Sequence, residues 1–263
     1  MNDEPFAPSN ALEDCLFNAA TDPSARPQFY RMLLGSEIYF LTPNVPAKTG
    51  QRVLEADTDL ALVHFQGEKE DFIPFFSSLK TLQQAVTPDN GYGFIAFNGK
   101  TAFDMLAEGS MPAVLNPGLT YGKEFLLDEM RQMADGSFFN ERPTVISKDK
   151  QILLGQPKEY PNSLIKSLQN LFKSHPSVTA AYLAQMHDPS SDDPPHILIG
   201  IECPGHMQIV APEAVLVAQE DTQRTTIVDF VEVGLKPGSI NDYFKNQTQP
   251  FYKSEPKPRW KFW

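Results

Sequence analysis

The segment from Ile73 to Val86 places the strongest constraint on how this chain can fold. It opens with Ile73–Phe76, an apolar run typical of a buried strand. Ser77 and Ser78 follow at once, and serine is among the residues preferred at the start of a helix. The next apolar residues recur at helical spacing and define an inward face: Leu79, Leu82 and Val86. The segment therefore predicts a strand, a cap and a helix in immediate succession.

Strand-like and helix-like segments alternate along the rest of the chain. The expected strands are residues 37–41, 60–65, 92–97, 113–116, 122–127, 178–186, 196–202 and 225–233, with edge strands at 145–146 and 152–154. The expected helices include 10–19, 29–35, 101–108, 164–172 and 240–244, one that ends at Met133, and one that contains Met207 and Val217, unless Pro212 delays its start.

The pattern weakens between residues 137 and 160, and we place a domain boundary there. We expect an α+β protein with two domains, 1–158 and 159–263, each a small mixed or antiparallel sheet with flanking helices. The second half has the order αββαβα, which suits helices on one face of a small antiparallel sheet.

The charge of the chain limits its partners. Its 33 acidic and 22 basic residues give a net charge of -11, which repels nucleic-acid backbones and anionic membrane surfaces. No stretch is apolar enough for a membrane span. Two cysteines far apart, Cys15 and Cys203, suit free thiols in a reducing compartment. We therefore expect a cytoplasmic protein that binds neither nucleic acid nor membrane.

One short span is rich in possible metal ligands: His187, Asp188, Asp192, Asp193, His196, Glu202, Cys203 and His206. Cys203 and His206 have the C-x-x-H spacing of zinc ligands. A structural zinc site needs four converging ligands, however, and no second close pair is evident. An acidic loop between two strands explains these residues more simply, so no metal or cofactor is expected.

No signature of catalysis is found in the sequence. G-x-S-x-G and H-E-x-x-H motifs are absent. Gly99-Lys100-Thr101 joins a strand to a helix, but its distance from Gly93 does not fit a phosphate-binding loop. Cys15 lies in an apolar stripe, and Cys203 follows the acidic Glu202 rather than basic neighbours that would activate a thiol. We therefore expect no catalytic residues and no enzyme activity.

Two groups of residues are candidates for binding a partner. The first lies beside glycine and proline turns and consists of Asn116, Lys123 and Glu124, for which local turn bonds and a surface ion pair are the alternative. The second belongs to a basic, aromatic C-terminal tail that holds both tryptophans: Arg259, Trp260, Phe262 and Trp263. The tail could equally dock on the chain's own acidic surface or be disordered.

Several short segments of the sequence resemble those of the SseB family. They are Ile73-Pro74-Phe75-Phe76-Ser77-Ser78-Leu79, Leu115-Asn116-Pro117, Gly122-Lys123-Glu124-Phe125, Leu198-Ile199-Gly200-Ile201-Glu202 and Pro250-Phe251-Tyr252. The resemblance extends over nearly the whole chain, except for the polar loop 188–195 and the tail after Tyr252. It implies a bacterial two-domain protein of a family named for enhanced sensitivity to serine, without established catalytic residues to carry over.

These observations favour a non-enzymatic protein that acts through contacts with another protein, as an adaptor, regulator or inhibitor. An immunity-type inhibitor is one version, because an acidic surface can oppose a basic toxin. The alternative is a small-molecule-binding protein or an enzyme that touches amino-acid metabolism. That alternative requires a polar cleft, with Lys100, Lys123 or the Cys203/His206 pair inside it.

Overall fold

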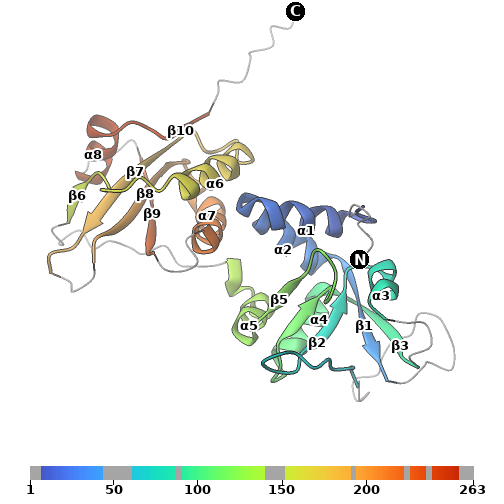
Figure 1. Ribbon diagram of the computed structural model, residues 1–263. Coiled ribbons are helices and arrows are strands. Elements are labelled where there is room, and N and C mark those ends of the chain that lie inside the picture. Colours follow the sequence, from blue (N-terminus) through green and yellow to red (C-terminus); the bar gives the residue numbers. More distant parts are fainter. Residues whose placement is uncertain are drawn as a thin grey trace, which may run out of the picture. The chain divides into compact units, whose positions relative to one another are not determined.

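The computed structural model describes residues 7–43, 61–86, 91–139, 152–190, 194–221, 226–234 and 239–254. The chain divides into two compact units (Figure 1). Unit 1 is Met1–Thr21 with Gln28–Phe139, and unit 2 is Asp22–Pro27 with Asn140–Trp263. The main division thus precedes residue 158, because β6 (Leu153–Gly155) pairs with a strand of the second sheet.

Unit 1 is built on a mixed five-stranded sheet with the strand order β3-β1-β2-β4-β5. Parallel pairing of β2 with β4 makes the sheet mixed, since its other pairs are antiparallel. The elements of this half, in chain order, are α1 (Ala11–Thr21), α2 (Arg26–Gly35), β1 (Glu37–Thr42), β2 (Ile73–Phe76), α3 (Leu79–Ala85), β3 (Gly93–Asn98), α4 (Gly99–Ala107), β4 (Ala113–Leu115), β5 (Lys123–Phe125) and α5 (Leu127–Asp135). A short 3-10 turn, η2 (Ser137–Phe139), follows α5, and a second one, η1 (Pro23–Ala25), precedes α2 in the sequence but belongs to unit 2.

The predicted succession of strand, cap and helix is confirmed. Ser78 caps α3, and its side chain and that of Thr81 form a reciprocal capping box. Leu82 is buried with Leu41 and Phe76 in one cluster. The expected inward position of Leu79 is wrong: this side chain is 37% exposed, because the cluster under α3 does not extend to its first residue.

Aromatic side chains fill the core of unit 1. Phe40 stacks on Phe75 at a centroid distance of 5.7 Å, and Phe103 contacts Phe125 at 5.2 Å. The strand expected at 60–65 is not formed within its described part, where only an isolated bridge joins Phe65 to Phe72. Val63 is buried in the same cluster as Leu82 of α3, and its N–H bonds to the Leu41 carbonyl of β1 at 3.0 Å without continuing into a strand.

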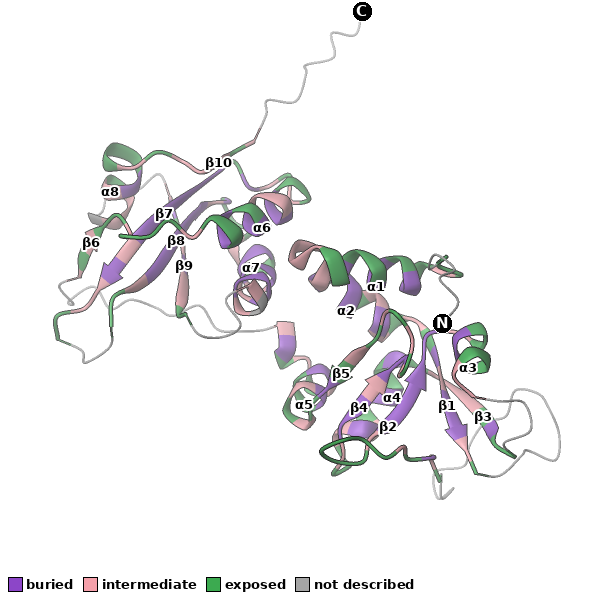
Figure 2. Cartoon of the chain, in the orientation of Figure 1, coloured by how far each residue is buried: buried purple, intermediate pink, exposed green. Residues whose placement is uncertain are grey.

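Unit 2 contains a second five-stranded sheet, ordered β10-β7-β8-β9, with β6 also paired to β7. Its elements are β6, α6 (Asn162–Lys173), β7 (Ala180–His187), β8 (His196–Glu202), α7 (Met207–Asp221), β9 (Val228–Glu232), α8 (Ser239–Gln247) and β10 (Tyr252–Lys253). The predicted order αββαβα is present, with β6 and β10 added. Figure 2 shows that β7 and β8 are largely buried, as central strands should be.

The second sheet is of the mixed kind that the fold prediction included, whereas the narrower expectation of an antiparallel sheet with helices on one face is corrected. The sheet is mixed, because α7 crosses over between β8 and β9 and leaves them parallel. Helices also cover both faces rather than one. Leu168 of α6 and Val217 of α7 belong to one core cluster, and Phe244 of α8 belongs to the cluster on the other side of the sheet. Within the described residues, no helix has the length and apolar character needed to cross a membrane.

Candidate functional site

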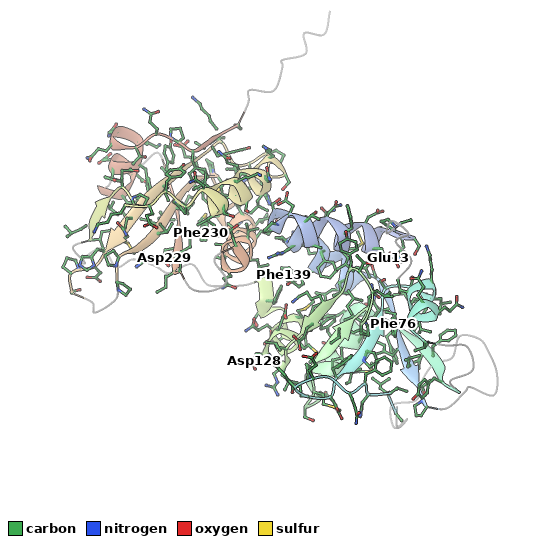
Figure 3. The ribbon with its side chains drawn as sticks, viewed as in Figure 1. Glu13, Phe76, Asp128, Phe139, Asp229 and Phe230 are labelled. Atoms are coloured by element: carbon green, nitrogen blue, oxygen red, sulfur yellow. The ribbon has the colours of Figure 1, made fainter. Side chains whose placement is uncertain are left out.

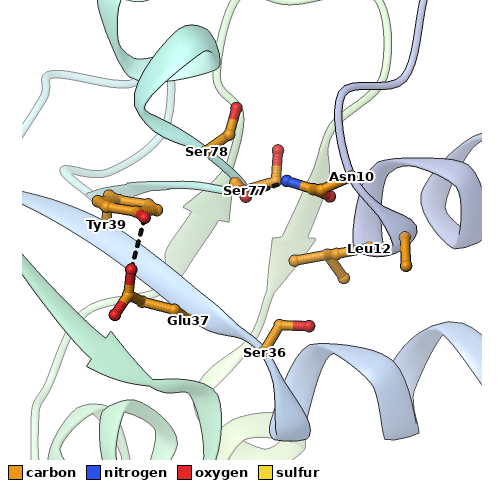
Figure 4. Close-up of a pocket in the computed structure, with 8 residues that line it drawn as sticks. Asn10, Leu12, Ser36, Glu37, Tyr39, Ser77 and Ser78 are labelled. Atoms are coloured by element: carbon orange, nitrogen blue, oxygen red, sulfur yellow. Dashed lines mark hydrogen bonds between the residues drawn. The ribbon is translucent and has the colours of Figure 1, made fainter.

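A pocket of about 300 Å³ lies in unit 1 (Figure 4). It forms where the first turn of α1 meets the start of β1 and the end of β2, which the antiparallel pairing of these strands brings together. Its lining contains one carboxylate and no lysine or arginine: Asn10, Ala11, Leu12, Ser36, Glu37, Tyr39, Ser77 and Ser78. The pocket therefore combines an apolar floor with hydroxyl groups and a negative charge.

A buried carboxylate fixes one wall of this pocket. Glu13 of α1 is only 1% exposed (Figure 3). Its Oε1 accepts hydrogen bonds from the hydroxyls of Ser77 at 2.9 Å and Ser78 at 2.7 Å, and its Oε2 accepts from the backbone N–H and hydroxyl of Ser9. Burial alone would raise the pKa of Glu13, but these hydrogen bonds outweigh burial and lower the pKa. Glu13 is thus an ionised tie between α1 and the β2–α3 junction.

Asn116 extends the same polar network. Its Oδ1 accepts from the backbone N–H of Ser77 at 3.0 Å, and its Nδ2 donates to the Ser77 hydroxyl at 2.9 Å. The backbone of Asn116 has a φ of 51°, in the left-handed region that asparagine tolerates better than most residues. Since the residue is only 1% exposed, its side chain lies in the interior of unit 1.

Glu37 is the one carboxylate in the lining of the pocket. The hydroxyl of Tyr39 donates to Glu37 Oε1 at 2.5 Å, as the dashed line in Figure 4 marks. This hydrogen bond, together with burial and the charge of Glu37, raises the pKa of Tyr39 to about 12. Tyr39 therefore keeps its proton, and among the described residues the Oε2 atom of Glu37 has no hydrogen-bond partner.

Exposed aromatic residues adjoin the pocket. Phe94 and Tyr92 are 47% and 43% exposed, and the Phe94 ring lies 6.4 Å from that of Tyr39. Phe94 lies on β3, the end strand of the described sheet, and Tyr92 lies one residue before that strand begins. We call Tyr39, Tyr92 and Phe94 the β3 aromatic surface. It is continuous with the pocket because Tyr39 belongs to both.

The other partner-binding candidates from the sequence lie elsewhere. Lys123 forms an ion pair with Glu129 at 3.0 Å, and its ammonium lies 4.7 Å from the centre of the Phe125 ring. This arrangement gives Lys123 a role within unit 1. Glu124 is exposed on β5. The tail candidates lie outside the described residues: Arg259, Trp260, Phe262 and Trp263.

The residues with metal-ligand chemistry do not converge in unit 2. His196 pairs with Asp229 at 2.8 Å, whereas the His206 ring bonds to the carbonyl of Pro204. Cys203 is fully buried, and burial together with the charge of Glu232 raises its pKa to about 11. Within the described part of the chain, no three His, Cys, Asp or Glu side chains are placed to hold a metal ion. Asp192 and Asp193 lie outside that part.

The Gly99-Lys100-Thr101 motif has a local explanation. Asn98 caps α4 by accepting from the Lys100 N–H at 3.1 Å. The Lys100 ammonium contacts Asp104 and the carbonyl of Ala134. Neither Lys100 nor Lys123 lines the pocket that the small-molecule alternative would require.

Sequence reasoning did not identify Glu37, Tyr39 or Phe94 as site residues, and it treated Glu13 only as part of a helix start. The expected start of the first helix at residue 10 is correct, since the Glu13 N–H bonds to Asn10 Oδ1 at 2.9 Å. The contact of the Glu13 side chain with Ser77, 64 residues away, had no such local signal.

Two family models match the chain. The model of the SseB protein N-terminal domain matches residues 12–132, and that of the SseB protein C-terminal domain matches residues 146–254. Two curated relatives called Protein SseB, from Escherichia coli (strain K12) and Shigella flexneri, are each 32% identical to it over 249 residues. These matches cover 93% of this chain and 92% of each relative. No solved structure matches the chain.

Proposed function

This chain belongs to the SseB family, and on that premise we propose that it acts without catalysis, by binding another protein through the β3 aromatic surface. The observation that carries this proposal is the exposure of Phe94, at 47%, on the end strand of the described sheet. An end strand can offer backbone N–H and C=O groups to an added strand, and aromatic residues are enriched at protein interfaces.

The favoured partner presents an extended segment with positive charge. Glu37 is exposed on the same face of the sheet as Phe94, and the whole chain has a net charge of -11. Complementary charge speeds association and excludes partners of like charge. Apolar side chains of such a segment would pack on Phe94 while its basic side chains face Glu37.

Replacing Phe94 with Asp should weaken partner binding at least tenfold, because an exposed aromatic anchor is replaced by a charge. The partner would first be captured from the native cell extract, and its affinity for purified protein would then be measured. Leu126→Asp is the matched control: Leu126 is 54% exposed in the same unit, and the substitution adds the same charge. Equal binding by the Phe94 and Leu126 variants would refute the proposed surface.

Deleting residues 255–263 tests the tail as a second contact. The deletion should begin at Glu255, because Lys253 is paired in β10 and the Ser254 N–H bonds to the Thr179 carbonyl at 2.9 Å. We expect the shortened chain to bind the same partner several-fold more weakly, since it lacks two tryptophans and three basic residues. Unchanged affinity would remove the tail from the proposal and leave the β3 aromatic surface.

A cytoplasmic location fits this proposal. Cys15 and Cys203 are both buried and unlinked, and they belong to different units. Free cysteines are typical of proteins in a reducing compartment, where glutathione and thioredoxin keep thiols reduced. Fractionation of native cells with an antibody to the chain would test the location directly.

A further inference from the structure

We propose that the unit 1 pocket binds a primary ammonium group. This inference does not depend on the proposed protein partner, and it can be tested on the purified chain alone. It is carried by the hydrogen-bond capacities of the pocket lining, which leave its hydroxyl groups able to accept but not to donate.

Each lining hydroxyl has already used its proton inside the protein. Ser36 donates to the Met32 carbonyl at 2.7 Å, and Tyr39 donates to Glu37. Ser77 and Ser78 donate to the buried Glu13 carboxylate. A hydroxyl has a single proton to donate and two lone pairs to accept with. Ser77 already accepts from Asn116 Nδ2 and Ser78 from the Thr81 N–H, so each of these hydroxyls keeps one lone pair. The four side chains can therefore offer a ligand only acceptor positions, and an ammonium group brings three donors.

The charges around the pocket select the same ligand. Glu37 lines the pocket, and one of its carboxylate oxygens has no partner among the described residues. The ionised Glu13 lies behind Ser77 and Ser78, so the wall that these serines form is also negative. The Tyr39 ring adds an aromatic face, which attracts cations. With no lysine or arginine in the lining, a cation meets no repulsion there.

The size of the pocket limits what can carry the ammonium. A cavity of about 300 Å³ is at the lower end of the range for small-molecule sites, roughly 300–1,000 Å³. A short alkylamine would fit, and so would the side chain of a lysine from a bound protein. Both sources present the same chemical group, so the test must distinguish them.

The test is a titration of isotope-labelled protein, followed by NMR at fixed ionic strength and pH 7. The probes are n-butylammonium, its neutral counterpart n-butanol, the anion butyrate, and Nα-acetyl-lysine methylamide as a lysine side-chain mimic. We expect saturable shifts of the pocket amides with n-butylammonium at millimolar concentrations, and at least tenfold weaker binding of n-butanol. Glu37→Gln should weaken n-butylammonium binding at least tenfold. Glu124→Gln, which removes an exposed carboxylate from β5 on the same face of the sheet, should change it less than twofold.

Each outcome either tests whether the pocket binds an ammonium group or identifies the molecule that carries this group. Saturation by n-butylammonium alone favours a free amine, and saturation by the lysine mimic alone favours a lysine of a bound protein. Preferred binding of butyrate would overturn the proposal and assign the pocket to the first N–H groups of α1, since Ala11 and Leu12 also line it. Equal effects of n-butanol and n-butylammonium, or no shifts with any probe, would also overturn it.

Discussion

Glu13→Ala should lower the free energy of unfolding of unit 1 by about 3 kcal/mol. The substitution removes the acceptor of the Ser77 and Ser78 hydroxyls, and both oxygens of Glu13 are in use. A hydrogen bond to a charged group contributes about 1.5–3 kcal/mol, and losses within one network are not additive. Ser77 can turn its proton to Asn116 Oδ1, 3.3 Å away, which limits the loss. Urea unfolding followed by circular dichroism would measure it.

Hydrogen exchange assigns that loss to unit 1. Peptides from α1 and the β2–α3 junction should exchange faster in Glu13→Ala, whereas those of β7 and β8 should be unchanged. Glu13→Gln is the matched variant of nearly equal shape, and its amide nitrogen would face hydroxyl and N–H donors. It should destabilise by about half as much as alanine, or roughly 1–2 kcal/mol. If both variants were as stable as the wild type, the hydrogen bonds of Glu13 would not contribute to stability, which would contradict this prediction.

The same carboxylate predicts a dependence of stability on pH. The pKa of Glu13 is lower in the folded chain than its ordinary value of 4.5 in the unfolded chain. The ionised form therefore stabilises the fold, and this contribution is complete above the unfolded pKa and declines as the pH falls toward the folded pKa. The difference in stability between wild type and Glu13→Gln should shrink below about pH 4.5. A difference that stays constant from pH 7 to pH 3 would show that the charge of Glu13 contributes nothing.

Local patterns were sufficient to predict most elements of the fold. The segment from Ile73 to Ala85 combines an apolar strand, a serine cap and a helical repeat, so each level of the pattern supports the same structure. Pro212 shows where a local rule failed. It does not delay the start of α7 but lies inside the helix, between the fully buried Val210 and Ala214. Packing of these neighbours evidently outweighs the hydrogen bond that proline cannot make.

The candidate site was not predictable because it depends on contacts between distant segments. Periodicity shows that alternate residues of β3 share a face, but it does not show which face of the sheet is covered. Ile95 and Phe94 both have apolar side chains, yet Ile95 is half-buried whereas Phe94 is 47% exposed. Asn116 precedes a proline turn, and this local pattern predicted a surface position because it does not show distant contacts. Its burial follows from hydrogen bonds to Ser77, which lies 39 positions earlier in the chain.

Gly99→Ala is expected to destabilise unit 1 by about 3 kcal/mol or more, since even milder overpacking of a core costs about 1–3 kcal/mol. A Cβ atom at this position would lie 2.0 Å from the carbonyl oxygen of Leu33 and 3.0 Å from the Cα atom of Leu34. Both are backbone atoms, so no side chain can rotate away to relieve the clash. The Gly99 N–H also donates to the Ser36 carbonyl at 2.8 Å, which holds α4 against the end of α2.

Gly35→Ala is the control for this substitution. Gly35 is exposed at the end of α2, and its Cβ would meet no atom within 4 Å. Alanine there should be neutral or stabilise the fold by a few tenths of a kcal/mol, about the gain seen when helical glycines are replaced. Thermal melting with and without nucleotides also distinguishes two explanations of Gly99-Lys100-Thr101. If the glycine is required for packing, Gly99→Ala lowers stability, and nucleotides leave the melting temperature of the wild type unchanged. If it serves phosphate binding, nucleotides raise that melting temperature and Gly99→Ala removes the rise.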